Sequence, residues 1–235
     1  MSTDSGRPTP LAVENVELHV LNMRTRMPFR YGIAAMTALP HLFVRVQAAF
    51  GGRREYGLAA DGLPPKWFTK DPHTAFRDDL EDMLRVIRHA AGVAQGLGEA
   101  PSVFALWQAL HAEQTRWGAA QGYPPLLSSL GTSLIERAAI DAFCRASGTS
   151  FGAALRGPGL GLRLAQVHPE LAGLQVADLL PAHPLRSTIV RHTVGLGDPL
   201  SEADIPPQER LADGLPQSLE AVIRTYGLTH FKLKL

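Results

Sequence analysis

The last six residues alternate between polar and apolar side chains, and this pattern constrains the fold more than any other feature of the chain. His230, Lys232 and Lys234 alternate with Phe231, Leu233 and Leu235. A period of two predicts a β-strand, and a spacing of two places both lysine ammonium groups on one face. The whole chain has only two other lysines, Lys66 and Lys70. A strand with one apolar face and one doubly charged face is unusual after a helix, where both faces are normally apolar.

Together with the residues before it, this strand forms a predicted βαβ unit. Residues 187–194 are rich in β-branched side chains and are followed by glycine, which predicts a strand. Residues 216–226 have helical spacing of apolar side chains and end at Gly227, and residues 229–235 form the second strand. A connection of this length makes the two strands parallel and the crossover right-handed.

The first part of the chain predicts an antiparallel meander followed by helices. Alternating patterns predict strands at 11–21, 41–50 and 55–60, and helical spacing predicts helices at 74–91, from Ser102 towards Trp117, and at 126–146. Small side chains at 138, 139 and 142 would let another helix approach closely. Two connections, 23–40 and 61–72, are apolar without a clear period, and we expect lids or binding loops there.

Composition excludes several classes of function. A formal net charge of +1 gives no long-range attraction to nucleic acid or to anionic membranes, and no apolar run reaches the roughly 18 residues of a membrane span. The single cysteine, Cys144, excludes an internal disulfide, and residues 1–10 are polar and expected to be disordered rather than a signal peptide. We therefore expect a cytoplasmic protein.

Three segments in this order resemble the enolase superfamily, specifically its muconate-lactonizing and mandelate-racemase-like branch. They are the meander with its two connections, the helix Leu-Ile-Glu-Arg-Ala-Ala-Ile-Asp-Ala-Phe-Cys-Arg-Ala-Ser-Gly at 134–148, and Tyr-Gly-Leu-Thr-His-Phe-Lys-Leu-Lys at 226–234. The resemblance implies an α+β capping domain over 11–185. It implies that 186–235 is the first βαβ unit of an incomplete (β/α) barrel.

The resemblance also implies a reaction. Such enzymes remove the α-proton of a carboxylate substrate, with Mg²⁺ stabilising the enediolate, and act as racemases, epimerases, cycloisomerases or dehydratases. Lys234 would be the base and Lys232 its electrostatic neighbour. The physics agrees, because a nearby cation and partial burial both lower the pKa of a lysine towards neutrality, where it is useful as a base.

Other roles follow from the same resemblance. Arg30 and Tyr31 in the first connection, and Lys66 and Trp67 in the second, would contact the substrate. The family's second capping loop departs from its usual pattern here, because the sequence reads Tyr-Gly-Leu-Ala-Ala-Asp at 56–61 and lacks the common acidic residue after its Gly-x-Gly. Metal ligands are absent from this chain and expected beyond Leu235, since a complete barrel takes about 250 residues.

We therefore expect an isomerase or lyase of which this chain is the N-terminal half, inactive alone and forming a homo-oligomer or associating with the missing barrel portion. Two alternatives stay open. The chain is a non-catalytic α+β binding or interaction module, or it is a truncated homologue that kept the cap and lost the metal site. The second alternative needs a partner to cover two open parallel strands.

Overall fold

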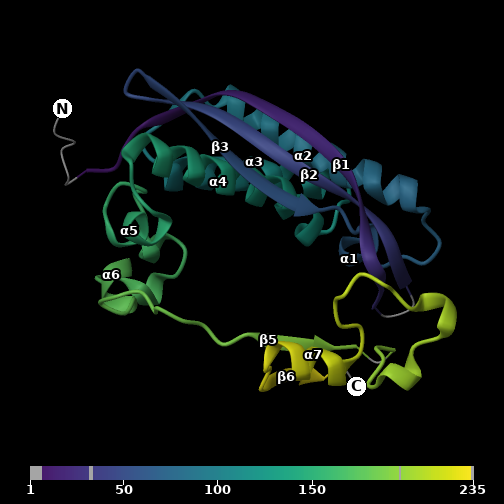
Figure 1. Ribbon diagram of the computed structural model, residues 1–235. Helices are drawn as coiled ribbons and strands as arrows, with labels where there is room; N and C mark the ends of the chain where they lie inside the picture. Colours follow the sequence, from purple (N-terminus) through teal and green to yellow (C-terminus); the bar gives the residue numbers. More distant parts are fainter. Residues whose placement is uncertain (1–6, 32–33, 196, 234–235) are drawn as a thin grey trace. The chain divides into compact units, whose positions relative to one another are not determined.

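A computed structural model describes residues 7–31, 34–195 and 197–233, and the contacts within the chain divide it into two compact units (Figure 1). The N-terminal unit comprises Met1–Met23 and Pro40–Pro184, and the C-terminal unit comprises Arg24–Leu39 and Leu185–Leu235. The sequence did not indicate that Arg24–Leu39 groups with the C-terminal residues. We call the described residues of this segment the arm.

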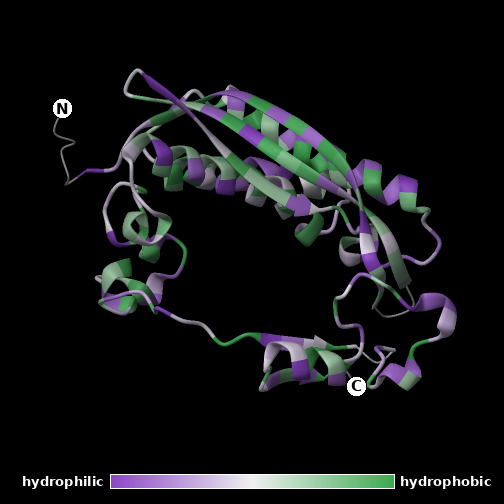
Figure 2. Ribbon diagram, in the orientation of Figure 1, coloured by the Kyte–Doolittle hydropathy of each residue, from purple (hydrophilic) through white to green (hydrophobic). Residues whose placement is uncertain are grey.

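A four-stranded sheet opens the chain, in the order β3-β2-β1-β4. It consists of β1 (Leu11–Tyr31), β2 (Ala34–Phe50), β3 (Arg53–Gly62) and β4 (Glu99–Ala100), and the pairs β2–β3 and β1–β4 are antiparallel. Figure 2 shows hydrophobic and hydrophilic residues interspersed along these strands. On β2 the buried side chains fall at every second residue: Leu42, Val44, Val46, Ala48 and Phe50. This confirms the predicted meander.

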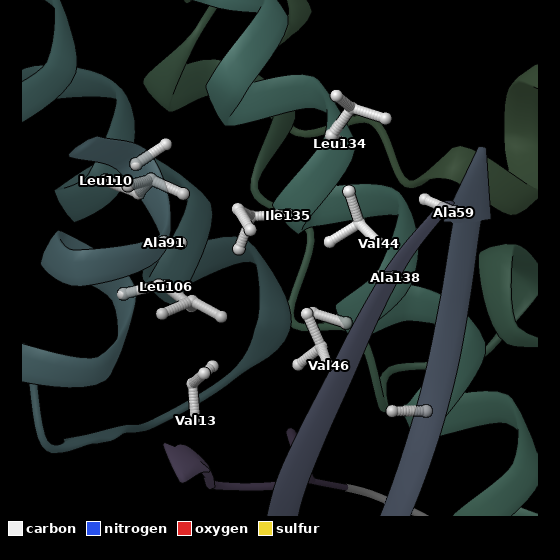
Figure 3. Close-up of a cluster of buried hydrophobic side chains, with 14 of the residues drawn as sticks. Val13, Val44, Val46, Ala59, Ala91, Leu106, Leu110, Leu134, Ile135 and Ala138 are labelled. Atoms are coloured by element: carbon white, nitrogen blue, oxygen red, sulfur yellow. The ribbon is translucent and has the colours of Figure 1, made fainter. Parts of the chain in front are cut away.

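Three helices cover one face of this sheet (Figure 1): α2 (Phe76–Gly96), α3 (Val103–Ala120) and α4 (Pro125–Ser147). The Ser102 hydroxyl accepts a hydrogen bond from the Ala105 N–H at 3.0 Å and so caps α3, as its sequence predicts. Gly148 ends α4 in the left-handed conformation, at φ +60°. Figure 3 shows Val44 and Val46 facing Leu134, Ile135 and Ala138 in the core between sheet and helices.

The small residues of α4 allow a strand to approach closely. A Cβ added at Gly57 on β3 would lie 2.1 Å from the Ala138 carbonyl oxygen and 2.2 Å from the Ala142 nitrogen. No side chain fits this space, so β3 and α4 touch through their backbones. Glycine at position 57 is required for the contact.

Polar side chains also join α4 to the outer edge of β3. Asp141 accepts a hydrogen bond from the Leu58 N–H at 2.9 Å, and Arg137 donates to the Ala60 carbonyl at 3.3 Å. Two residues before Leu58, the Tyr56 N–H donates to the Glu55 side chain at 3.0 Å. The three bonded backbone groups fall at alternate residues, which is the spacing of outward-facing groups on an edge strand.

The C-terminal unit contains the expected strand, helix and parallel strand: β5 (Arg191–Val194), α7 (Leu219–Tyr226) and β6 (His230–Leu233). The Ser218 hydroxyl caps α7 by accepting from the Ala221 N–H at 3.2 Å, and Gly227 ends it at φ +62°. The pairing register joins Thr193 to Lys232 and Val194 to Leu233. Among the described residues of this unit, the buried apolar side chains are Val194 and Ile205.

The first connection, expected as an aperiodic loop, is instead the distal part of β1 and β2. Thr25 on β1 donates from its hydroxyl to the Met36 carbonyl on β2 at 3.1 Å. Arg24, Arg26, Met27 and Phe29 are all exposed. Because no face of the arm is buried against helices, its strands need no apolar alternation, and the sequence therefore carried no strand signal.

Short elements fill the remaining chain: α1 (Pro65–Phe68), α5 (Phe151–Arg156), α6 (Val176–Leu179) and 3₁₀ turns at Leu164–Gln166, Pro169–Leu171, Glu202–Asp204 and Pro207–Glu209. Of the tail predicted to be disordered, residues 1–6 lie outside the described residues, and the Thr9 N–H donates to the Gly159 carbonyl at 3.1 Å. No helix among the described residues is long and apolar enough to span a membrane. The cytoplasmic location and the homo-oligomer stay predictions.

Candidate functional site

A pocket of about 960 Å³ lies within the C-terminal unit. One wall is the arm, with Thr25, Met27, Phe29 and Met36, and the end of β5 forms another. The third wall is the β5–α7 connection, residues 197–218. Apolar side chains on it include Ile205 and Leu211. The N-terminal unit has a smaller pocket of about 690 Å³ on α4 and α5. Among the described residues no lysine lines either pocket, but β5, which lines the first, pairs with the strand that carries Lys232. We therefore take the first pocket as the candidate site.

The lysine strand lies beside the β5 wall of the pocket. Thr193 lines the pocket and is the register partner of Lys232 on β6. Directly paired residues of neighbouring strands project their side chains from the same face of a sheet. Lys232 therefore projects from the face that carries Thr193, and its side chain is exposed among the described residues. Lys234, the predicted base, lies outside the described residues.

Carboxylates around the pocket are already occupied by donors of the same connection. Asp198 accepts from the Gly195 N–H at 2.6 Å. Asp204 accepts from the Ser201 N–H at 2.8 Å and from its hydroxyl at 3.0 Å. These hydrogen bonds, the backbone one first, lower the pKa of Asp204. They stabilise the ionised acid and shape the connection.

Magnesium has no ready-made site in the part of the chain that the structure describes. No group of three or more His, Cys, Asp or Glu side chains gathers there in an arrangement that could hold a metal ion. A magnesium site normally needs carboxylate oxygens with free lone pairs. Asp198 and Asp204 accept their hydrogen bonds on Oδ2 and belong to no such group, so the described residues do not fit the ion.

An arginine of the arm binds the β5–α7 connection. Arg26 donates from Nε to Asp213 Oδ2 at 2.6 Å and from Nη2 to Asp213 Oδ1 at 2.8 Å, which makes a bidentate ion pair. The hydrogen bond from Arg26, followed by that from the Leu215 N–H, lowers the pKa of Asp213 to about 2. Neither residue carries a local signal in the sequence, since the two partners are 187 positions apart.

Lys66 and Trp67 belong to the N-terminal unit, where Lys66 holds a buried acid. The Lys66 Nζ lies 2.7 Å from Oδ2 of Asp79, which is only 2% exposed. It also donates to the carbonyl oxygens of Asp71 and Thr74, at 2.8 and 2.7 Å. Oδ2 makes no hydrogen bond of good geometry, so the contact acts through charge. These partners anchor the second connection.

Trp67 follows on the short helix α1 and is 59% exposed. The ion pair of Lys66 therefore fixes the position of α1, and the Trp67 ring on this helix faces solvent. Arg30 and Tyr31 end β1, but their side chains lie outside the described part of the structure. The substrate contacts predicted for Arg30, Tyr31, Lys66 and Trp67 stay predictions.

Two solved structures have the same fold as the chain. An enolase from Bradyrhizobium, in complex with magnesium and mandelic acid, is 13% identical with a TM-score of 0.54, and the match covers 97% of this chain and 46% of that one. An enolase from Streptomyces coelicolor, solved without magnesium and with an ordered loop, is 18% identical with a TM-score of 0.54, covering 95% and 45%. No protein-family model and no curated protein matches the sequence.

The chain thus spans less than half the length of these two enolases. At such identities the comparison establishes the fold and leaves the chemistry open. The predicted fold, an α+β capping domain joined to the first strands of an incomplete barrel, is confirmed, and so is the resemblance to the enolase superfamily at the level of fold.

Proposed function

We propose that this chain supplies the cap and the first barrel strands of an enzyme that removes the α-proton of a carboxylate substrate. Racemisation, epimerisation, cycloisomerisation and elimination all begin with this step. The observation that carries the proposal is the placement of the lysine strand beside the pocket, where Lys232 pairs with the pocket-lining Thr193. The fold shared with a Bradyrhizobium enolase holding magnesium and mandelic acid supports the substrate class.

The proposal gives the two lysines different roles, one as the base and the other as its electrostatic neighbour. Lys234 accepts the α-proton, and Lys232 precedes it by two residues, a spacing that predicts one shared strand face. Two ammonium groups so close disfavour each other's charge, which lowers the pKa of the base and increases its neutral fraction at physiological pH. The apolar walls of the pocket exclude water from the reacting carbon.

Magnesium enters by analogy with the Bradyrhizobium complex. A bound divalent ion would hold the substrate carboxylate and lower the energy of the negative charge that forms as the proton leaves. Because the described residues present no ligand set, the proposal assigns no metal ligand to this chain.

The test is α-proton exchange in deuterated water, measured by NMR on the complete protein with Mg²⁺. The probes are both enantiomers of mandelate and a panel of 2-hydroxy and 2-amino carboxylates. Lys234→Ala should abolish exchange from at least one enantiomer, since it removes the base. Lys232→Ala should slow exchange and raise the pH at which the rate reaches half its maximum. Lys70→Ala, a change of an exposed lysine in the N-terminal unit, is the matched control.

Two outcomes contradict the proposal. Full exchange by Lys234→Ala on both enantiomers would remove the base from the mechanism. Absence of exchange in the unaltered protein with every probe would count against α-proton chemistry as the function.

A further inference from the structure

All five N–H donors of the Arg26 guanidinium have partners within the protein. Besides the two bonds to Asp213, its Nη2 donates to the Leu215 carbonyl at 2.8 Å and its Nη1 donates to the Pro216 carbonyl at 3.1 Å. The other Nη1 donor points to the Met27 sulfur at 3.7 Å. A guanidinium has five N–H donors and no acceptor, so none is left for a ligand.

The connection is shaped to receive this arginine. Asp213 Oδ1 also accepts the Leu215 N–H at 3.1 Å, which closes a tight turn around Gly214. Gly214 adopts φ +76°, a conformation that favours glycine. The turn brings the carboxylate and the Leu215 carbonyl to one side, where they meet the same guanidinium nitrogen. An arginine fork matches this arrangement, whereas a lysine ammonium presents a single point of charge.

The two partners lie on opposite walls of the pocket. Arg26 is on the arm, and Pro216, which accepts from it, is on the β5–α7 connection. Gln217 adds a weaker link, because its amide lies 3.8 Å from the Met27 sulfur while bonding the Glu209 carbonyl at 2.9 Å. The distance between the arm and the connection therefore depends chiefly on the Arg26–Asp213 pair.

We propose that Arg26 and Asp213 form a latch that holds the arm against the β5–α7 connection and so sets the width of the pocket. Arg26 is a positioning residue, and the substrate carboxylate binds elsewhere. The inference rests on the proposed function for its consequence in catalysis. The latch itself is a property of the protein without substrate and can be tested separately.

The test is hydrogen–deuterium exchange of the complete protein, followed by mass spectrometry of peptides that cover residues 24–31. Arg26→Gln and Asp213→Asn should each accelerate exchange in the arm by roughly fivefold, the upper range for an exposed ion pair. The double variant should exchange no faster than Arg26→Gln alone, because losing the guanidinium already removes its bonds to Asp213, Leu215 and Pro216. Arg24→Gln is the matched control. Arg24 lies on the same strand, and no hydrogen bond or ion pair of its side chain occurs among the described residues.

The KM values of the same variants show whether Arg26 acts as a latch or binds the substrate. A latch predicts that both variants raise the KM for α-proton exchange, Asp213→Asn by no more than Arg26→Gln, which also loses the bonds to the Leu215 and Pro216 carbonyls. If Arg26 bound the substrate carboxylate, Arg26→Gln alone would raise KM, and that result overturns the proposal. Arm exchange that is unchanged in both variants, or that Arg24→Gln accelerates equally, also overturns it. Because arm exchange is measured without substrate, failure of the proposed function leaves this part of the test intact.

Discussion

Replacing Gly57 by alanine should strongly destabilise the N-terminal unit. The new methyl group would lie 2.1 Å from the Ala138 oxygen and 2.2 Å from the Ala142 nitrogen, both on the backbone of α4. Strand and helix must separate to admit it, which costs about 3 kcal/mol at the upper end of overpacking effects. Separation also breaks the bond between the Leu58 N–H and Asp141, worth about 1 kcal/mol. We expect a total loss of roughly 3–4 kcal/mol.

Urea titration followed by tryptophan fluorescence measures this loss. All three tryptophans, Trp67, Trp107 and Trp117, belong to the N-terminal unit, so their emission reports on its unfolding. Gly92→Ala is the control, because Gly92 is an exposed residue inside α2 with nothing within 4 Å of an added Cβ. It should stabilise the unit by about 0.5–1 kcal/mol, because alanine is the better helix former.

A second substitution sharpens the test. The clash is with backbone atoms, so Ala142→Gly in the Gly57→Ala background should recover no stability and should cost about 1 kcal/mol more. Recovery by Ala142→Gly would show that side chains, rather than backbones, set the spacing. A loss below about 0.5 kcal/mol for Gly57→Ala alone would refute the close contact, since ordinary surface changes have effects of that size.

Lys66→Met should destabilise the N-terminal unit by about 3 kcal/mol in urea titrations, since Asp79 would stay buried without its cation, whereas Lys70→Met should be neutral. Equal effects would exclude the ion pair as a structural element. Burial raises the pKa of Glu136 above its ordinary 4.5, so stability is lost as pH rises from the unfolded pKa through the folded one. Glu136→Gln should therefore raise the unfolding free energy at pH 7 and leave it unchanged at pH 3, and equal gains at both pH values would contradict this. Burial also raises the pKa of Cys144. Its thiol should react with an aromatic disulfide reagent at pH 8 roughly tenfold more slowly in the native protein than in urea, and equal rates would contradict burial.

Elements with one buried face were predictable from the sequence, because burial imposes a period on the side chains. The alternation of Leu42, Val44 and Val46 located β2, and Ser102 and Gly148 marked helix ends through local capping chemistry. Each of these signals lies within a few residues of the feature that it predicts.

Features that depend on distant partners left no such signal. The arm is a hairpin whose side chains are largely exposed, so its strands have no period to detect. Arg26 acquires its role only from Asp213, far along the chain. Lys66 was predicted from the sequence to contact substrate. Its ion-pair partner, Asp79, lies in an amphipathic helix, where the sequence does not distinguish it from a surface acid. Lys232 and its alternating strand were identified because the pattern is local, although the chemistry of that strand stays a proposal.

The side chains that bond the outer edge of β3 also limit how copies of this protein associate. A foreign strand can extend a sheet only by finding unpaired N–H and C=O groups. At β3 the Leu58 N–H and the Ala60 carbonyl already belong to Asp141 and Arg137. At the opposite margin β4 pairs with only Leu11 and Ala12 of β1. Fibril growth or peptide docking by strand addition is therefore directed to the β1 margin. Loosening α4 would free the backbone groups of β3 and make that edge a second site for strand addition.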